Sequence, residues 1–521
     1  MNLLMDDWIP VQKEGVFQHI SLKAMLTQDK SWQITLPRDD MEMACLQLLV
    51  SLTQVLFIPE DKAQLKKKIA QPLTESDYAD AIEDKVDWFE LDHPKAPFMQ
   101  VREVKAKEPN PMVKLFAGFT ESTSSTFVNE PGLADSVCPS CAAIGLFNQA
   151  NSCASFCGGA KGSIRGNLKG DELKSGVPIT TLVSADSLRE KIWLNILTQE
   201  HIEKYLLIEK GVNDKPNWVD LISTVGVSKN KIKQGEDVQL NKLGLLRGLF
   251  WQPQHIELLL GRQSGVCDSC GRESICLYTG FLFEKFSYTY KGFWIHPHSP
   301  LKWTVTKGEK KLGYRSFNSQ IPIWTHLIGL LINEDAEKGG HSPAPVISQF
   351  KKYFILGKEL HLLVGGYWTK PGKASINERR HEVFNISEHL SKKDIGVEDI
   401  VNIGLAYKKE LDNSFYFIKK DISSSAKIPK PIERFISGMA SQAEHRFYKQ
   451  TELLVHSMLR DMDFKESKAA FTHYHQQLHE TTRTIFKKIT EPYQNEPKMI
   501  KALAIARRGL DKELKKLKEI A

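Results

Sequence analysis

Hydrophobic and polar positions follow two different patterns along this chain. Over residues 1–388, short runs of aromatic and β-branched residues at 281–290 and 362–368 predict strands, while apolar runs at 40–58 and 192–208 predict helices. This region has no alternation of strands with helices and no internal repeat. We therefore expect residues 1–388 to form a large, irregular α+β domain that mixes both kinds of element.

After residue 388 the pattern becomes helical, with amphipathic segments near 397–420, 431–460, 466–489 and 497–519. In the last two segments, apolar residues recur at steps of three and four, which is the spacing of one helix face. These residues are Phe471, Tyr474, Leu478, Ile485 and Ile489, followed by Leu503, Ala506, Leu510, Leu514 and Leu517. We expect residues 389–521 to form a C-terminal four-helix bundle, with this stripe as its core.

Composition is that of an ordinary globular protein. Of 521 residues, 41% are hydrophobic and 26% charged, and the length favours two or more domains. The most apolar stretch, 45–58, is too short and too polar to cross a bilayer. The first ten residues contain Asp6 and Asp7 and lack a basic, then apolar, leader pattern. We expect a cytoplasmic protein with no membrane segment, whose cysteines are free or bound to metal.

Positive charge is concentrated at the C-terminal end. Residues 481–521 contain 11 Lys and Arg against 5 Asp and Glu, so six of the seven net positive charges lie there. Such a segment suits a polyanionic partner, although a solvated helix face has the same composition.

Two CxxC pairs are the clearest sign of chemistry. Each pair brings two thiolates within reach of one Zn²⁺, and two pairs complete a closed tetrahedral site. The 125 residues between the pairs far exceed the roughly 15–20 of a zinc ribbon, and Cys153 and Cys157 offer a competing CxxxC pair. We predict a structural Zn²⁺ on Cys138, Cys141, Cys267 and Cys270.

Catalytic patterns are weak by comparison. A zinc deaminase needs His-x-Glu before its cysteines, and a phosphate-binding P-loop needs GxxxxGK[ST]; the chain has neither. His296 and His298 offer two metal ligands, but no carboxylate completes a hydrolytic site. We therefore predict no catalytic residue and no enzyme activity.

A glycine-rich, basic stretch follows the first cysteine pair, over residues 157–176. It begins with Gly158 and Gly159, and its cations include Lys161 and Arg165. Glycine lets backbone N–H groups approach a phosphate or a base edge, while the cations neutralise charge. A flexible linker would have a similar composition. Because the stretch is long and follows a cysteine pair, we favour nucleic-acid contact.

A second candidate is the sequence Lys370-Pro-Gly-Lys373. Pro-Gly at the two central positions is typical of a type II turn, so the flanking segments 362–368 and 374–383 could pair as a hairpin. Its tip would present two lysines, with Trp368 close behind. Such a tip could enter a DNA minor groove or separate base pairs, although most hairpin tips are simply exposed turns.

Several segments together resemble CasA, the large subunit of the type I-E CRISPR surveillance complex Cascade. The similarity runs nearly from end to end, and the order and spacing of the segments make chance agreement improbable. The segments are Met1–Leu4, Trp8–Pro10, Leu36–Met41, Phe127–Asn129, Leu146–Asn151, Arg247–Pro253, Glu378–His381 and Arg446–Tyr448.

The resemblance implies a non-catalytic subunit that recognises the protospacer-adjacent motif (PAM) in double-stranded target DNA. Such a subunit reads the motif through the minor groove and helps unwind the duplex, so that guide RNA can pair and an R-loop can start. It also binds other Cascade subunits and recruits a trans-acting helicase–nuclease in antiviral defence.

The resemblance also implies roles for particular residues. Motif contacts fall on a glycine loop at Gly158 and Gly159, on Lys285, and on a wedge at Lys370, Lys373 and Ala374. The loop that docks on the guide RNA and a neighbouring subunit begins at Phe127, Val128 and Asn129, and the zinc ligands are the four cysteines already named. One departure concerns the wedge: the family's best-known wedge carries amide side chains, whereas this one is longer and carries lysines. We expect retained strand separation with relaxed or altered motif choice.

Two other functions remain open at this point. The cysteines, with His296 and His298, are also compatible with a zinc-dependent enzyme that processes nucleic acids. Alternatively, the helical bundle could make the chain a pure scaffold subunit.

Overall fold

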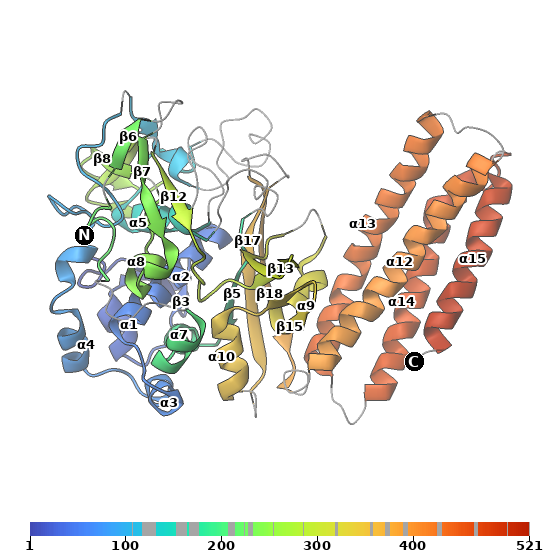
Figure 1. The fold of residues 1–521 in the computed structure, drawn as a ribbon, viewed down its shortest axis with the longest axis horizontal. Coiled ribbons are helices and arrows are strands. Elements are labelled where there is room, and N and C mark those ends of the chain that lie inside the picture. Colours follow the sequence, from blue (N-terminus) through green and yellow to red (C-terminus); the bar gives the residue numbers. More distant parts are fainter. Residues whose placement is uncertain are drawn as a thin grey trace. The chain divides into compact units, whose positions relative to one another are not determined.

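The computed structural model describes the following residues, which make up most of the chain (Figure 1). They are residues 1–106, 108–116, 132–152, 164–165, 177–206, 214–222, 224–227, 233–253, 255–284, 286–317, 321–354, 358–369, 376–388, 394–424, 430–462, 467–497 and 499–519.

Contacts within the chain define two compact units. The first comprises Met1–Ser319, Asn333–Tyr353 and Leu362–Val383. The second comprises Gln320–Ile332, Phe354–His361 and Phe384–Ala521. Compactness alone does not establish that a unit folds independently, so the division into domains at residue 388 stays a prediction.

Helices and small sheets are mixed in the first unit, which confirms the expected irregular α+β class. Its helices are α1 (Leu22–Thr27), α2 (Asp39–Leu56), α3 (Lys62–Ala70), α4 (Glu75–Ile82), α5 (Pro139–Ser152), α6 (Leu188–Trp193), α7 (Gln199–Tyr205), α8 (Leu245–Leu249) and most of α10 (Pro345–Phe354).

The described strands form several sheets of two to four strands, rather than one continuous sheet. The orders are β2-β1-β3, β10-β9, β4-β11-β8, β12-β7-β6, β14-β13-β16-β15 and β18-β17-β5. The strands are β1 (Ile9–Lys13), β2 (Val16–Ile20), β3 (Gln33–Ile34), β4 (Asn110–Pro111), β5 (Thr180–Ser184), β6 (Thr224–Val227), β7 (Lys233–Gln239), β8 (His255–Arg262), β9 (Gly265–Val266), β10 (Glu273–Ser274), β11 (Leu277–Glu284), β12 (Phe286–Lys291), β13 (Leu301–Thr306), β14 (Glu309–Tyr314), β15 (Glu334–Ala336), β16 (Gly339–Ser342), β17 (Leu360–Thr369) and β18 (Ile376–Ile386).

Helix α2 provides much of the core of the first unit. Acidic residues in its first turn, Asp39, Asp40 and Glu42, lie where the helix dipole favours negative charge. Nearly every side chain from Met41 to Gln54 is buried, and α2 packs against α5. The predicted helix at 40–58 is therefore confirmed within two residues at each end.

The single helix expected over 192–208 was wrong, because the segment divides into α6 and α7. The side chain of Asn195 accepts from the backbone N–H of Val183 and donates to its carbonyl, at 2.8 and 2.7 Å. Asn195 thus satisfies backbone groups of β5 and ends the first helix. Pairing with a distant strand overrides the local helical pattern here.

Strands β17 and β18 are neighbours in one sheet, as predicted for the two flanks of residues 370–373. Two glycines let β17 pack closely on other elements. A Cβ on Gly365 would lie 2.1 Å from Sδ of Met43 on α2, and Gly366 has a positive φ of 149°. Strand β17 therefore packs directly against α2.

In the second unit, four long helices lie side by side, orange to red in Figure 1. They are α12 (Asp394–Ser424), α13 (Lys430–Asp461), α14 (Ser467–Thr490) and α15 (Ile500–Glu519), and the short α9 (Leu327–Leu331) packs against α12. The predicted stripe is buried over most of its length, with Phe471 and Leu517 half-buried at its ends. The expected bundle is confirmed. No helix in the described part of the chain is long and apolar enough to cross a membrane.

Candidate metal centre and nucleic-acid interface

The first cysteine pair is positioned by the start of α5. Pro139 is the first helical residue, a position where its missing N–H costs nothing. The carbonyl of Cys138 accepts from the N–H of Ala142 at 2.9 Å, and the N–H of Cys141 points to Sγ of Cys138 at 3.5 Å. The first helical turn therefore brings both sulfurs to the same side.

The second pair lies in the tight loop between β9 and β10. The N–H of Gly271 donates to the carbonyl of Cys267 at 2.8 Å, and Gly271 has a φ of 72°. A residue with a Cβ would be strained in this left-handed conformation, so glycine lets the chain turn immediately after Cys270. The turn directs Cys267 and Cys270 toward the first pair.

Backbone contacts join the two loops independently of the sulfurs. The N–H of Ser136 donates to the Asp268 carboxylate at 2.6 Å, and the N–H of Asp268 donates to the carbonyl of Ser136 at 2.9 Å. One residue further along, Val137 and Tyr278 exchange two backbone hydrogen bonds of 2.9 Å. Asp268, which the sequence analysis did not single out, therefore aligns the two cysteine pairs.

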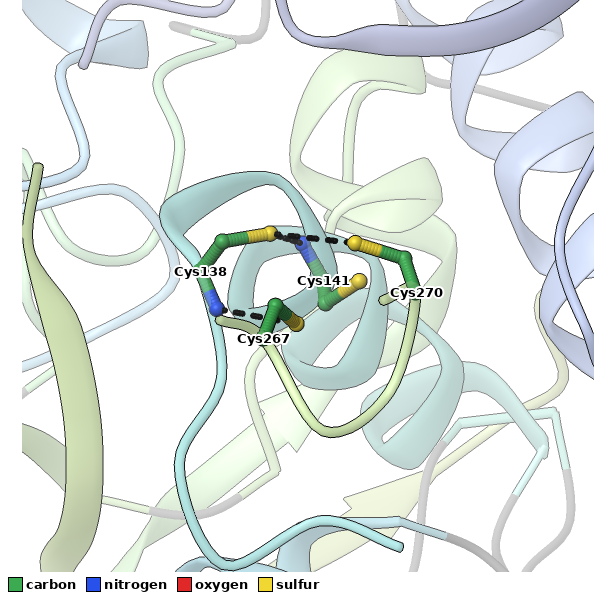
Figure 2. Close-up of side chains that lie close together, drawn as sticks. All are labelled: Cys138, Cys141, Cys267 and Cys270. Carbon is green, nitrogen blue, oxygen red and sulfur yellow. Dashed lines mark hydrogen bonds between the residues drawn. The ribbon is translucent and has the colours of Figure 1, made fainter. Parts of the chain in front are cut away.

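The four cysteines converge on one point, as Figure 2 shows. Their sulfurs all lie within 4.8 Å of one another, and Sγ of Cys138 is 3.8 Å from Sγ of Cys270. Metal–sulfur bonds of about 2.3 Å in a tetrahedron separate the sulfurs by about 3.8 Å, so the cluster could hold a metal ion. Hydrogen bonds from Cys138 and Cys141 lower the pKa of both Cys267 and Cys270, which favours their thiolate forms.

The other predicted site residues lie outside the described residues, so their predicted roles stay predictions. They are Phe127, Val128 and Asn129 of the docking loop, Gly158, Gly159 and Lys161 of the glycine stretch, Lys285, and Lys370, Lys373 and Ala374 of the wedge. The competing ligands Cys153 and Cys157 also fall there.

Arg165 was expected among the DNA-neutralising cations of the glycine-rich stretch, and that expectation was wrong. Its side chain is only 1% exposed. The guanidinium donates to the carbonyl of Asn151 at 3.2 Å, to the hydroxyl of Thr180 at 2.9 Å and to that of Ser299 at 2.6 Å. Arg165 therefore anchors the middle of the stretch in the protein interior.

The elements that lead into the glycine loop and the wedge are joined by hydrogen bonds. Asn148 on α5 donates to the hydroxyl of Tyr367 on β17 at 2.7 Å. That hydroxyl in turn donates to the carboxylate of Asp40 on α2 at 2.8 Å. Because α5 ends at Ser152, five residues before the glycine-rich stretch, and β17 ends at Thr369, one residue before the wedge, these contacts bring together the two elements that lead into both segments.

Charges around Asp40 hold this junction. Burial disfavours the ionised form of Asp40, but hydrogen bonds from Arg38 at 2.9 and 2.5 Å outweigh it and lower the pKa. Arg379 on β18 adds an ion pair at 3.1 Å. The adjoining cavity is about 20 Å³, with room for one water molecule. The side chains at this junction of α2, α5, β17 and β18 are therefore closely packed and leave no pocket for a ligand.

His296 and His298, the other candidate metal ligands, are 0% and 1% exposed. Burial, followed by the charge of Arg165, lowers the pKa of both, to about 3 for His298. The Nδ1 of His296 accepts the N–H of His298 at 3.0 Å. The two histidines are part of the core. This agrees with the sequence analysis, which found no carboxylate to complete a hydrolytic site with them.

Comparison with known proteins identifies the family. The profile of CRISPR-associated protein Cse1 matches residues 2–485, which is more than nine-tenths of the chain. The chain belongs to the Cse1 family. This confirms the resemblance to CasA inferred from the sequence motifs.

Solved structures of similar fold extend over nearly the whole chain. Cse1 from Thermobifida fusca superposes with a TM-score of 0.74 at 16% identity, covering 100% of this chain and 98% of that one. CasA from Thermus thermophilus superposes with a TM-score of 0.70 at 16% identity, covering 99% of each chain. One chain of a structure described as a CRISPR RNA-guided surveillance complex superposes with a TM-score of 0.64 at 13% identity. The match covers 98% of this chain and 99% of that one. At these identities the likeness establishes the fold.

Three of the sequence motifs that carried the resemblance meet at the Asn148–Tyr367 junction. Asp40 comes from the Leu36–Met41 segment, Asn148 from Leu146–Asn151, and Arg379 from Glu378–His381. The motifs are far apart in sequence, but they form one joint in this Cse1-family chain. Tyr367 lies outside all three motifs, and no local sequence signal distinguishes it.

Proposed function

We propose that this chain is the non-catalytic large subunit of an RNA-guided surveillance complex of the type I-E Cascade kind. It recognises the PAM in double-stranded DNA through the minor groove and helps to unwind the duplex to start an R-loop. It then recruits a trans-acting helicase–nuclease in cytoplasmic antiviral defence. Membership of the Cse1 family and the fold shared with a chain of a surveillance complex support this proposal.

The observation that carries the proposal is the hydrogen bond between Asn148 and Tyr367. From Asn148 to the end of α5 the helix rises only about 6 Å, and from Tyr367 to the end of β17 the strand extends about 7 Å. The ends of α5 and β17 are therefore close enough for the segments that follow them to reach one turn of a duplex, which is about 34 Å long. Two contacts on the same short motif require this proximity.

We further propose that the four cysteines hold a structural Zn²⁺. Four thiolates close the coordination shell, so the ion has no open position for a substrate. Its role would be to hold the Cys138 loop against the Cys267 loop. The Cys138 loop follows the predicted docking segment Phe127–Asn129, whose partners would be the guide RNA and a neighbouring subunit.

A test of the function uses the complete complex assembled with its guide RNA. Binding is measured on target duplexes randomised at the positions flanking the guide-matched sequence. Lys285→Ala should lower affinity for motif-bearing duplexes by about tenfold while leaving the zinc content unchanged. Lys307→Ala, which removes an exposed lysine from the turn between β13 and β14, is the control and should bind normally. Equal affinity of the Lys285 variant and the wild type would contradict the proposed motif contact.

The same library tests the wedge. Replacing Lys370 and Lys373 together by Gln restores amide side chains that both donate and accept at base edges. The preferred motifs should then change, while opening of the duplex is retained. An unchanged preference would show that the wedge lysines do not influence motif choice.

Two simple measurements address the alternative functions. Turnover of labelled DNA or RNA in the presence of metal would favour the zinc-dependent enzyme, although burial of His296 and His298 argues against it. A pure scaffold would show little salt dependence in DNA affinity, whereas phosphate contacts make affinity fall steeply with salt.

A further inference from the structure

The helical bundle of the second unit contains an open cleft between α12 and α14. Its lining residues come from the N-terminal halves of both helices and, through Leu517, from the end of α15, so the cleft lies within one unit. Its volume is about 520 Å³. Ligand pockets in proteins commonly measure about 300–1,000 Å³ and occur between the helices of bundles. The cleft is therefore large enough to hold a small molecule.

Four apolar side chains line the cleft and are only half-buried. Phe471 and Leu517 belong to the apolar stripes of α14 and α15, which are otherwise buried in the bundle, and α12 adds Ile403 and Ala406. An apolar group placed against these side chains would be removed from water together with them, which favours binding. The cleft therefore suits a ligand with an apolar body.

One buried polar side chain also lines the cleft. His475 is 6% exposed, and its Nδ1 lies 3.1 Å from the hydroxyl of Tyr407, which is 0% exposed. Among the described residues this is the only hydrogen bond of the hydroxyl, so the hydroxyl donates its proton there and Nδ1 accepts. Burial lowers the pKa of His475, so the ring is neutral at pH 7 and carries its proton on Nε2. The Nε2–H has no acceptor in the described part of the chain, and it is available to a molecule in the cleft.

The charges around the cleft do not favour an ionic ligand. The two charged residues that line it, Asp399 and Lys468, are both exposed and carry opposite signs. An anion or a cation would therefore meet one attractive and one repulsive group, both screened by solvent. The N–H of His475 is the group that distinguishes one apolar ligand from another, because a buried donor left without an acceptor is costly.

We propose that this cleft is a binding site for a small, uncharged molecule with an aromatic or branched apolar body and one carbonyl oxygen, which accepts from the Nε2–H of His475. The half-buried apolar walls provide most of the affinity, and His475 provides the selectivity. The site is independent of the proposed contacts with DNA.

Acetophenone and ethylbenzene are suitable probes, because they have nearly the same shape and differ by a carbonyl group. Their binding to the full chain is measured by NMR of labelled isoleucine and leucine methyl groups. Acetophenone should shift the signals of Ile403 and Leu517 saturably. It should leave the signal of Ile505 unchanged, since this residue is exposed on α15 and does not line the cleft. Absence of a saturable shift at Ile403 and Leu517 would overturn the proposal.

His475→Phe removes the donor and keeps a ring. Affinity for acetophenone should fall by about tenfold, which is the effect of one hydrogen bond. Affinity for ethylbenzene should change by less than about twofold, so comparing the two probes isolates the hydrogen bond from other effects of the substitution. Equal losses for the two probes would show that His475 does not bind the carbonyl.

Ala406→Trp provides a second variant if His475→Phe fails to fold. A bulky ring at this half-buried wall position should fill the cleft and abolish binding of both probes. Ala504→Trp is the matched control, because Ala504 is exposed on α15 and does not line the cleft. It should bind both probes like the wild type. If the two tryptophan variants bind alike, the probes bind elsewhere and the proposal fails.

The assembled complex distinguishes a ligand site from a protein interface. Saturation-transfer NMR of acetophenone, with the Ala406→Trp complex as a blank, should show that the probe still binds after assembly. Binding to the free chain that is lost on assembly would mean that a neighbouring subunit covers the cleft, and the ligand site would be overturned.

Discussion

Asp268 and Ser136 hold each other through two hydrogen bonds, one from each backbone N–H. Asp268 accepts with its carboxylate at 2.6 Å and donates its own N–H to the Ser136 carbonyl at 2.9 Å. Asp268 lies within the second cysteine loop and Ser136 lies two residues before Cys138, so the pair aligns the two halves of the metal centre across 132 positions of sequence.

Removing this carboxylate should weaken the metal centre. Asp268→Ala leaves the N–H of Ser136 without its acceptor, at a cost of about 1–3 kcal/mol, and should speed the loss of metal to a chelator. Asp268→Asn keeps an acceptor oxygen, so its stability and its rate of metal loss should lie between those of the wild type and those of Asp268→Ala. Urea unfolding and the rate of metal release measure both effects; an Ala variant as stable and as slow to release metal as the wild type would contradict this role.

Loss of one metal ligand should affect the first unit alone. Cys270→Ser removes one of the four sulfurs, so the bound ion and the order of both loops should be lost together. Elemental analysis reports the metal, and hydrogen exchange of peptides covering 132–141 and 265–278 reports the loops. Exchange in α12–α15 should not change. Cys276→Ser, a half-buried cysteine outside the cluster, is the control and should retain both metal and protection.

Gly248 on α8 should not tolerate even a methyl group. A Cβ there would lie 2.1 Å from the ring of Trp294, which is 1% exposed. Gly248→Ala should therefore cost about 1–3 kcal/mol, although alanine is the better helix former by about 1 kcal/mol. Tryptophan fluorescence during urea unfolding is a suitable measurement, since every tryptophan except Trp324 lies in the first unit.

Gly438 on α13 provides the matched control for Gly248. Nothing lies within 4 Å of a Cβ built at this position. Gly438→Ala should therefore stabilise the second unit by up to about 1 kcal/mol through helix propensity alone. Because Trp324 is the only tryptophan in that unit, circular dichroism is the better measurement. Equal effects of the two substitutions would mean that packing against Trp294 is not what selects glycine.

Acidification should destabilise the fold before the carboxylates titrate. Burial, with the charges of Arg165 and Lys352, lowers the pKa of His298 to about 3 and that of His201 to about 4. Both histidines titrate near 6.5 when unfolded, so below that pH the unfolded chain binds more protons and stability falls. Urea midpoints should be lower at about pH 5 than at about pH 7.5, and His298→Asn should reduce the difference. If the urea midpoints of His298→Asn differ between the two pH values as much as those of the wild type do, His298 does not contribute to the loss of stability in acid.

Local pattern was sufficient for the long helices of this protein. Apolar residues repeated at steps of three and four predicted α14 and α15, and their burial confirms it. The pattern failed at 192–208, where Asn195 pairs with β5. A helix repeat is visible within one segment, whereas a partner strand elsewhere in the chain is not.

The sequence by itself determined which residues could ligate metal and which family the chain belongs to, because the CxxC spacing and the ordered motifs are local features. Only the tertiary structure decided that Arg165 is an internal anchor and that Asn148, Tyr367 and Asp40 form one joint. Composition gives the charge of an arginine, but its environment depends on acceptors from α5, β5 and the Ser299 loop that meet only after folding.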